Sequence, residues 1–205
     1  PDGKAYQCTL PESATFSDKS PLTSSDVLFT FTTKKAMETS RNPESDWREI
    51  SIETPNSITV RISTIGSANV LAEKMSLGIM PKILWESVPI ESIQDSSLNL
   101  KPVGAGPFKI GSIAYTNSLP TEVALVPNPR HSSDKPYLKR LLIRSYTNQL
   151  DLASALRNRE INSTTALKSD YIDPVIKNGF SIRAINSPKS VDLWVSQSAS
   201  QSPSV

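Results

Sequence analysis

Two short runs in which every second residue is apolar constrain this chain more than any other feature. The runs cover residues 50–52 and 58–62, and the polar stretch 54–57, which contains a proline, separates them. Because successive side chains of a strand point to opposite faces, such alternation is typical of strands with one buried face. Two such runs around a short turn predict a β-hairpin.

A helix is predicted before this hairpin, over residues 24–39. Thr23 is a suitable N-cap because its hydroxyl can accept a hydrogen bond from a free backbone N–H at the helix start. Asp26, three residues later, can return a capping-box contact. Val27 and Phe31 are among the expected core contacts of this helix.

The remaining elements are predicted from the same signals. Further helices are expected at 68–77, 82–85, 148–158 and 169–177, and further strands at 6–10, 108–113, 122–126, 138–146, 161–167, 181–185 and 191–196; the stretch 87–100 is expected to be a surface loop. From residue 138 onward strands and helices alternate, which indicates an α/β sheet layer. The fold class predicted from the sequence is therefore α/β, with a mixed α+β first part.

Charge and composition exclude several classes of function. The chain has 22 basic and 20 acidic residues spread along its length, a net charge of +2, which disfavours nucleic-acid binding because phosphates require a basic face. Cys8 is the single cysteine, so an internal disulfide framework and a cysteine-based zinc site are excluded. His131 is the single histidine, which excludes a histidine-rich metal site. No apolar run reaches the roughly 18 residues that a membrane span needs.

No arrangement typical of an enzyme is recognised. Gly104 and Gly106 lack the third glycine of a dinucleotide-binding fingerprint, and a strand rather than a helix is expected after them. His131 lies in a polar stretch, and the spacing pairs no serine and acid with it. Asp18 and Asp26 could mimic a carboxylate pair, but capping already explains Asp26. We therefore expect no catalytic residue, no metal and no cofactor.

Five segments, in order along the chain, resemble motifs of the extracytoplasmic solute-binding proteins that serve oligopeptide-type ABC importers, solute-binding family 5. FSDKSPLTSSDVLFT at 16–30 is similar to F-S-D-G-x-P-L-T-A-x-D-V-x-F-T, and GIMPKILW at 78–85 is similar to I-L-P-K-H-x-W. PVGAGPFK at 102–109 is similar to P-I-G-T-G-P-Y/F-K, VPN at 126–128 with KPYL at 135–138 to L-x-x-N-x-x-Y followed by P-x-L, and LRNREIN at 156–162 to A-L-x-x-G-E-I-D. Together the five cover nearly the whole chain.

The chain departs from these motifs at five positions. Lys19 and Arg159 stand where the family has glycine, Ile83 replaces a common histidine, Asn162 replaces an aspartate, and His131 lies near a usual tyrosine. The departures indicate a divergent member, and they bear on the ligand class more than on the fold.

The resemblance implies a partial lobe of a type II periplasmic-binding-protein-like fold together with its inserted α+β subdomain. Family members run to roughly 500 residues, whereas single domains have about 50–250, so we expect this chain to be a piece of a longer protein. Residues 1–103 are expected to form the inserted subdomain, 104–197 the central α/β part of the first lobe, and 198–205 a disordered tail.

The function implied by the resemblance is solute capture and delivery. An oligopeptide or related small solute enters a cleft between two lobes, the lobes close, and the closed form docks on an ABC permease. The expected location is periplasmic or at the cell surface, where a lipid anchor would hold the full-length protein, and we expect a monomer that binds no nucleic acid. Peptides, nickel complexes, opines and sugar oligomers all stay open as solutes. The alternative is a structural or interaction module of this family that binds no solute.

The expected ligand contacts lie in VDLWVSQ at 191–197, which aligns with the family strand x-x-L-x-F-N. Strand alternation places Trp194 and Ser196 on one face, opposite the aliphatic side chains. Trp194, Ser196 and Gln197 are the ligand-binding residues that this alignment implies, and a tryptophan ring offers a large apolar surface with one N–H donor. In the alternative, Trp194 packs beneath a helix of its own lobe. Because ligand sites normally enclose their ligands, residues 1–205 alone are not expected to bind short peptides at micromolar affinity.

Overall fold

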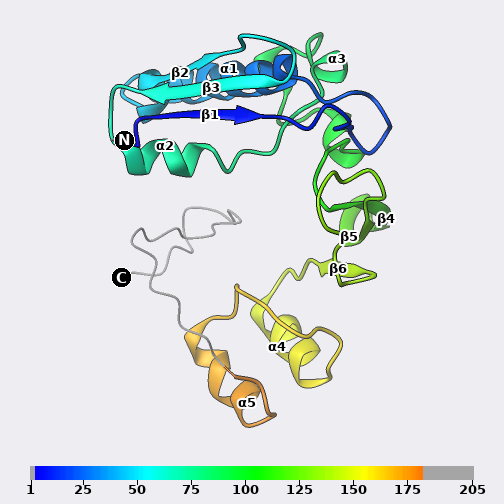
Figure 1. The fold of residues 1–205 in the computed structure, drawn as a ribbon. Coiled ribbons are helices and arrows are strands. Elements are labelled where there is room, and N and C mark those ends of the chain that lie inside the picture. Colours follow the sequence, from blue (N-terminus) through cyan, green and yellow to red (C-terminus); the bar gives the residue numbers. More distant parts are fainter. Residues whose placement is uncertain (1–2, 182–205) are drawn as a thin grey trace. The chain divides into compact units, whose positions relative to one another are not determined.

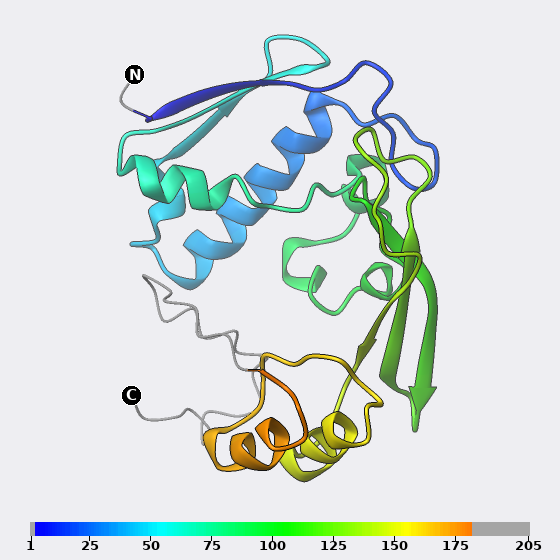
Figure 2. The same ribbon diagram turned by 60° about the horizontal axis from the view of Figure 1, so that its bottom comes forward.

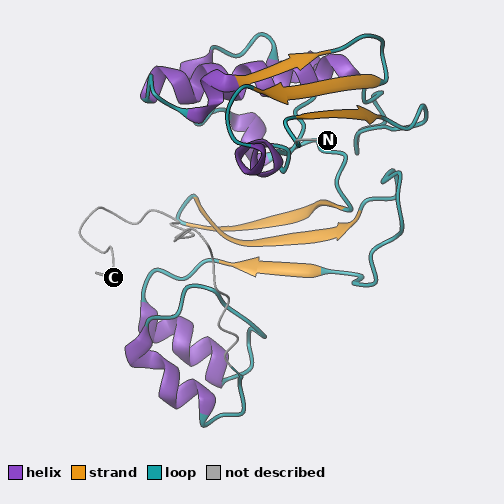
Figure 3. Ribbon diagram, turned by 60° about the vertical axis from the view of Figure 1, so that its left-hand side comes forward, coloured by secondary structure: helices purple, strands orange, loops and turns teal. Residues whose placement is uncertain are grey.

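The computed structural model describes residues 3–181. Contacts divide the chain into two units, Pro1–Arg144 and Ser145–Val205 (Figure 1), and each is described by itself. The first unit holds two three-stranded antiparallel sheets, and the described part of the second consists of short helices and loops (Figure 3).

The predicted hairpin is confirmed as part of the first sheet. Strands β2 (Ile50–Glu53) and β3 (Thr59–Thr64) pair antiparallel, and β1 (Ala5–Thr9) pairs with the other side of β3, so that the order is β1-β3-β2. The side chain of Asn56 closes the turn, because its Oδ1 accepts from the backbone N–H groups of Ile58 and Thr59 at 3.0 and 2.8 Å.

Helices α1 (Ser24–Arg41) and α2 (Ala68–Lys74) cover one face of this sheet (Figure 2). The buried core between helices and sheet consists of Val27, Phe31, Trp47, Ile50, Val60, Ile62 and Leu71. Phe31 and Trp47 meet edge to face, with ring centroids 5.9 Å apart, an arrangement that aromatic pairs favour. The predicted inward face of α1, with Val27 and Phe31, is thereby confirmed.

The stretch after this core is more ordered than the sequence indicates. The helix expected at 82–85 is α3 (Lys82–Trp85). Two 3-10 turns, Ile90–Ser92 and Ser97–Leu100, lie in the stretch 87–100, where a surface loop was expected. Ile93 between the two turns is buried. The Asn99 side chain donates to the Ile93 carbonyl at 2.7 Å, so local hydrogen bonds hold a segment that has no apolar periodicity.

The second sheet is built from β4 (Phe108–Thr116), β5 (Leu119–Pro127) and β6 (Leu141–Arg144), in the order β4-β5-β6. The first two strands are longer than predicted because they are joined by a tight turn. Asn117 and Ser118 both have positive φ, 50° and 65°, as the two central residues of a type I′ hairpin turn require.

The second unit is organised around α4 (Gln149–Arg157) and α5 (Ile172–Ile176), which follows a 3-10 turn at Ser169–Tyr171. Asn148 caps α4, since its Oδ1 accepts from the Asp151 N–H at 2.8 Å. Buried Ala153, Leu156 and Val175 form the core of this unit, and Ile161, Leu167, Tyr171 and Phe180 pack around it.

The strand predicted at residues 161–167 is wrong. This stretch is a loop. Its last part forms backbone hydrogen bonds with the side chain of Gln149 and not with a neighbouring strand. The Gln149 amide donates to the Ala166 carbonyl at 3.0 Å, and its Oε1 accepts from the Lys168 N–H at 2.8 Å. The strands predicted at 181–185 and 191–196 lie outside the described residues, apart from Ser181. The division into 1–103, 104–197 and 198–205 stays a prediction.

Candidate functional site

The three residues expected to contact a ligand, Trp194, Ser196 and Gln197, lie outside the described residues. What the structure does place are the motif segments. Four of them are joined by hydrogen bonds within the first unit, and we call this set the motif junction: residues 16–30, 80–82, 104–107 and 128–131.

Asp26 is the centre of one half of the motif junction. It is 7% exposed, and its Oδ2 accepts from both the N–H and the hydroxyl of Thr23 at 2.8 Å. The predicted capping box between Thr23 and Asp26 is therefore confirmed. Oδ1 of the same carboxylate accepts from the Lys82 N–H at 2.8 Å. One turn further along α1, the hydroxyl of buried Thr30 accepts from the Met80 N–H at 2.9 Å. Two side chains of α1 thus fix the backbone that enters α3.

Asn128 is the centre of the other half. It is 3% exposed, and its side-chain amide donates to the Gly106 carbonyl at 2.9 Å while its N–H donates to the Pro107 carbonyl at 2.8 Å. His131 Nδ1 lies 3.0 Å from the Ala105 carbonyl. The Ser17 N–H donates to the Gly104 carbonyl at 2.9 Å, so the 104–107 loop is held from two directions.

These contacts assign a structural part to three polar side chains of the motifs. The carboxylate of Asp26, the hydroxyl of Thr30 and the amide of Asn128 are all engaged with backbone groups, and buried polar groups are stable only when paired in this way. Sequence reasoning explained Asp26 by capping alone and assigned Asn128 no role. The signal that could have found Asn128 is its place in the fourth motif.

The other residues considered from the sequence are accounted for locally. Asp18 lies in an exposed turn, where its Oδ1 accepts from the N–H and hydroxyl of Ser20 at 2.9 and 2.6 Å. Trp47 and Trp85 are buried. Cys8 is half-buried on β1. Within residues 3–181, no group of three or more His, Cys, Asp or Glu side chains is placed to hold a metal ion.

Two shallow depressions occur on the first unit. One of about 270 Å³ lies between α1 and β2 and is lined by Leu28, Phe31, Thr32, Lys35, Ile50, Ser51 and Ile52. The ammonium of Lys35 donates to the Ile50 and Arg48 carbonyls at 2.8 and 3.0 Å. The second, of about 310 Å³, is lined by Lys34, Glu38, Trp47, Glu73, Lys74, Ser76 and Leu77. The Ser76 hydroxyl in its lining donates to the Glu73 carbonyl at 2.8 Å.

Comparison with known proteins decides the family. A model described as bacterial extracellular solute-binding proteins, family 5 Middle, matches residues 1–195. The chain belongs to this family. The resemblance read from the five motifs is thereby confirmed.

Curated relatives match the family 5 chain over most of its length but over only part of theirs. A Brucella ovis protein assigned as an ABC transporter peptide-binding protein is 27% identical, over 95% of this chain and 38% of its own length. The oligopeptide-binding protein AppA of Bacillus subtilis is 24% identical, over 82% of this chain and 31% of its own. The matched part of this chain therefore corresponds to 31–38% of the length of these relatives.

Solved structures show the same fold. AppA from Bacillus subtilis, in complex with a nonapeptide, aligns with a TM-score of 0.64 at 22% identity and covers 78% of this chain and 32% of its own. NikZ from Campylobacter jejuni, in complex with Ni(L-His), aligns with a TM-score of 0.61 at 24% identity, with 78% and 31% coverage. The predicted mixed α/β class, part of a type II periplasmic-binding-protein-like fold, is confirmed. None of the helices described in residues 3–181 has the length and hydropathy of a membrane span.

Proposed function

We propose that this chain is part of the substrate-binding component of an ABC importer, which captures oligopeptides or a related small solute outside the cytoplasmic membrane and delivers them to the permease. The observation that carries the proposal is the match to the family 5 model over residues 1–195. The peptide-binding names of the Brucella ovis and Bacillus subtilis relatives support a peptide as the first solute to test.

The motif junction fits the scaffold of such a protein. Its polar side chains hold backbone segments in place, which gives a cleft rigid walls, and no bond is made or broken in capture and release. We therefore propose a protein without catalytic activity, cofactor or nucleic-acid partner that acts as a monomer. Its place is the periplasm or the cell surface, with a lipid anchor on the full-length protein.

Trp194, Ser196 and Gln197 are our proposed ligand contacts. Peptide main chains can be bound through hydrogen bonds that leave the side chains free to vary, and Ser196 and Gln197 supply such donors and acceptors. Residues 1–103 are proposed to form the inserted subdomain and 104–197 the central part of the first lobe.

Peptide uptake by the source cells tests the proposal. Disruption of the gene is expected to lower the uptake of labelled tri- to pentapeptides, and the wild-type gene is expected to restore it. A Trp194→Ala gene should restore less uptake than Trp194→Phe at equal protein level, because only phenylalanine keeps a ring. Parallel arms with a nickel complex, an opine and a sugar oligomer identify another solute if peptides are unaffected. Unchanged uptake in every arm would overturn the proposal in favour of a structural module.

A further inference from the structure

Positive charge is concentrated in one loop, although the net charge of the whole chain is only +2. Residues 128–140, which connect β5 to β6 and which we call the basic loop, contain four Lys or Arg and one Asp, a formal charge of +3. The other 18 basic and 19 acidic residues of the chain sum to −1. The basic loop therefore carries a local excess of positive charge, and the rest of the chain is nearly neutral.

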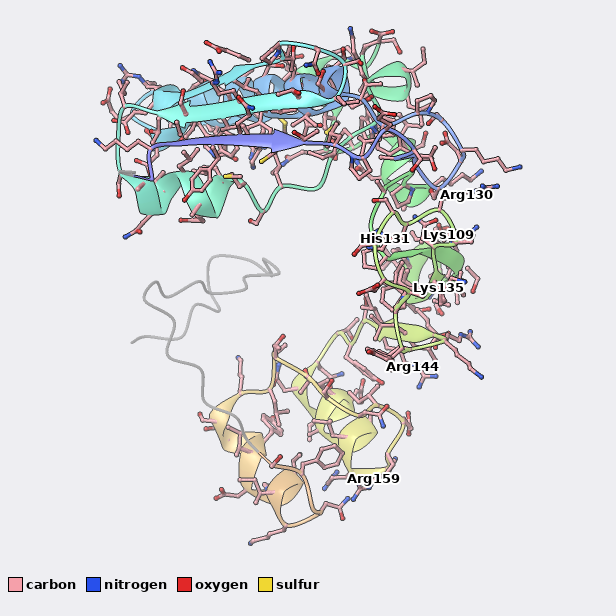
Figure 4. The ribbon with its side chains drawn as sticks, viewed as in Figure 1. Lys109, Arg130, His131, Lys135, Arg144 and Arg159 are labelled. Atoms are coloured by element: carbon pink, nitrogen blue, oxygen red, sulfur yellow. The ribbon has the colours of Figure 1, made fainter. Side chains whose placement is uncertain are left out.

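The four cations of the basic loop face solvent. Arg130, Lys135, Lys139 and Arg140 are all exposed, and none of them forms an ion pair with another of the described residues. Arg144, just beyond the loop, differs in this respect, because it pairs with Glu122 at 2.7 Å. Figure 4 shows Arg130, His131 and Lys135 in one region together with Lys109 of β4. The positive potential of the loop is thus not neutralised by neighbouring carboxylates.

Two large side chains with apolar surface lie among these cations. Tyr137 is fully exposed, at 104%, and Leu138 is 57% exposed. Lys135 and Pro136 precede them, and Lys139 and Arg140 follow them directly, so the two side chains lie between cations along the sequence. A tyrosine with an apolar body and a polar tip is typical of the membrane–water interface, and lysine and arginine beside it are attracted to anionic lipid.

The loop is held at its base. Asn128 and His131 bind the carbonyls of Gly106 and Ala105, and β6 begins directly after Arg140. The two depressions described above are lined by residues outside the basic loop, which presents charge and apolar surface side by side. These features favour an extended anionic surface as the partner.

We propose that the basic loop binds the surface of an anionic lipid bilayer. Lys135, Lys139 and Arg140 would lie against phosphate headgroups, and Tyr137 and Leu138 would enter the boundary between headgroups and acyl chains. An extracellular solute-binding protein works beside the outer face of a membrane, where such a contact would keep it close to the bilayer. The inference rests on the loop alone and does not depend on which solute is bound.

Flotation with lipid vesicles tests the proposal. The chain is mixed with vesicles of phosphatidylcholine or of phosphatidylcholine with one-third phosphatidylglycerol. We expect it to float with the anionic vesicles only. Raising the salt from about 0.1 to about 1 M should release it, because the screening length falls from about 10 to about 3 Å. The triple variant Lys135→Glu, Lys139→Glu, Arg140→Glu should bind anionic vesicles at least about tenfold more weakly.

A matched variant separates the loop from net charge. Lys19→Glu, Lys101→Glu and Lys177→Glu together change the total charge equally, at exposed sites outside the loop, and should leave vesicle binding within about twofold of the wild type. Tyr137→Ser with Leu138→Ser should weaken binding while keeping every cation. Equal loss in the matched variant, or no flotation of the wild type, would overturn the proposal. Capture by an acidic polypeptide or by single-stranded DNA, without binding to vesicles, would assign the loop to a different anionic partner and overturn it as well.

Discussion

The carboxylate of Asp26 joins the first turn of α1 to the backbone of Lys82, whose N–H donates to Oδ1 at 2.8 Å across 56 positions of sequence. The other oxygen of the same group accepts from the N–H and the hydroxyl of Thr23. A single buried side chain therefore stabilises both the start of a helix and a tertiary contact, and these two parts can be separated by mutation.

Asp26→Ala is expected to lower the free energy of unfolding by about 2–3 kcal/mol, because it removes charge-assisted hydrogen bonds and leaves the Lys82 N–H without its partner. Thr23→Ala should cost only about 1 kcal/mol, the usual value for an N-cap. Urea denaturation measures both. Asp18→Ala is the control, since its carboxylate bonds only to Ser20 in an exposed turn. Equal losses for Asp26→Ala and Thr23→Ala would show that the bond to Lys82 contributes nothing.

Local signals predicted the helix, the hairpin and the capping box, because residues that are close in sequence decide them. The contacts of Asp26 with Lys82 and of Asn128 with Gly106 join segments 56 and 22 positions apart. No periodicity encodes such pairs, so sequence reasoning did not find them. The prediction of a strand at 161–167 was wrong for a related reason. Ile161 and Leu167 pack against the core that α4 and α5 form, and not against another strand. The ligand contacts proposed at residues 194–197 stay a prediction.

Lys19 and Arg159, which stand where the family motifs have glycine, have left-handed backbones with φ of 82° and 61°. A residue with a side chain pays about 1–2 kcal/mol for this conformation, whereas glycine adopts it without strain. Glycine is also freer in the unfolded chain, which lowers the free energy of unfolding by about 0.5–1 kcal/mol and offsets part of the gain. Lys19→Gly should therefore raise the free energy of unfolding by about 0.5–1 kcal/mol, as measured by urea denaturation.

Arg159→Gly should give no such gain. The Arg159 guanidinium donates to the Asn178 carbonyl at 3.0 Å and lies 4.9 Å from the centre of the Phe180 ring, and both contacts vanish with the side chain. These contacts offset the strain of the left-handed backbone. A gain for Arg159→Gly as large as that for Lys19→Gly would contradict this account.

Gly104 and Gly179 should respond oppositely to alanine. The backbone of Gly104 does not have a positive φ, and a Cβ added there would meet no atom within 4 Å among the described residues. Gly104→Ala should stabilise the isolated chain by about 0.4–1 kcal/mol by restricting the unfolded state. Gly179 has φ of 84°, and an added Cβ would lie 3.3 Å from the Arg159 guanidinium, so Gly179→Ala should cost about 1 kcal/mol. Thermal unfolding of both variants checks the signs, and a loss at Gly104 would reveal a backbone constraint there.

The ion pair between Lys34 and Glu38 should make stability depend on pH in the acid range. The hydrogen bond from Lys34 holds the pKa of Glu38 below its ordinary value of 4.5. A carboxyl whose pKa is lower in the folded state contributes stability above its unfolded pKa, and that stability is lost as the pH falls through the folded value. Because both side chains are partly exposed, the effect is about 0.3–0.5 kcal/mol. Lys34→Met should weaken this dependence below pH 4.5, because Arg41 and Lys74 still lower the pKa of Glu38, whereas Lys101→Met should keep it in full.

Asn128→Asp is the sharpest test of the motif junction, because it exchanges one donor for an acceptor at constant shape. The new carboxylate oxygen would face the Gly106 carbonyl at the 2.9 Å now spanned by an N–H donor. Two acceptors in a buried place repel, so we expect a loss of about 2–3 kcal/mol at neutral pH. Protonation restores a donor, so the loss should shrink in urea titrations at about pH 3.

Asn56→Asp is the matched control for this exchange. Its Oδ1 accepts from two backbone N–H groups in an exposed turn, and a carboxylate keeps both bonds. This variant should therefore be nearly neutral in stability at either pH. If Asn128→Asp proved equally neutral, the amide of Asn128 would not hold the 104–107 loop. If Asn128→Asp lowered the free energy of unfolding equally at neutral and acid pH, the cause would be a steric disturbance and not the missing donor. A protonated carboxyl can again donate to the Gly106 carbonyl, so the loss of the donor alone would be relieved in acid.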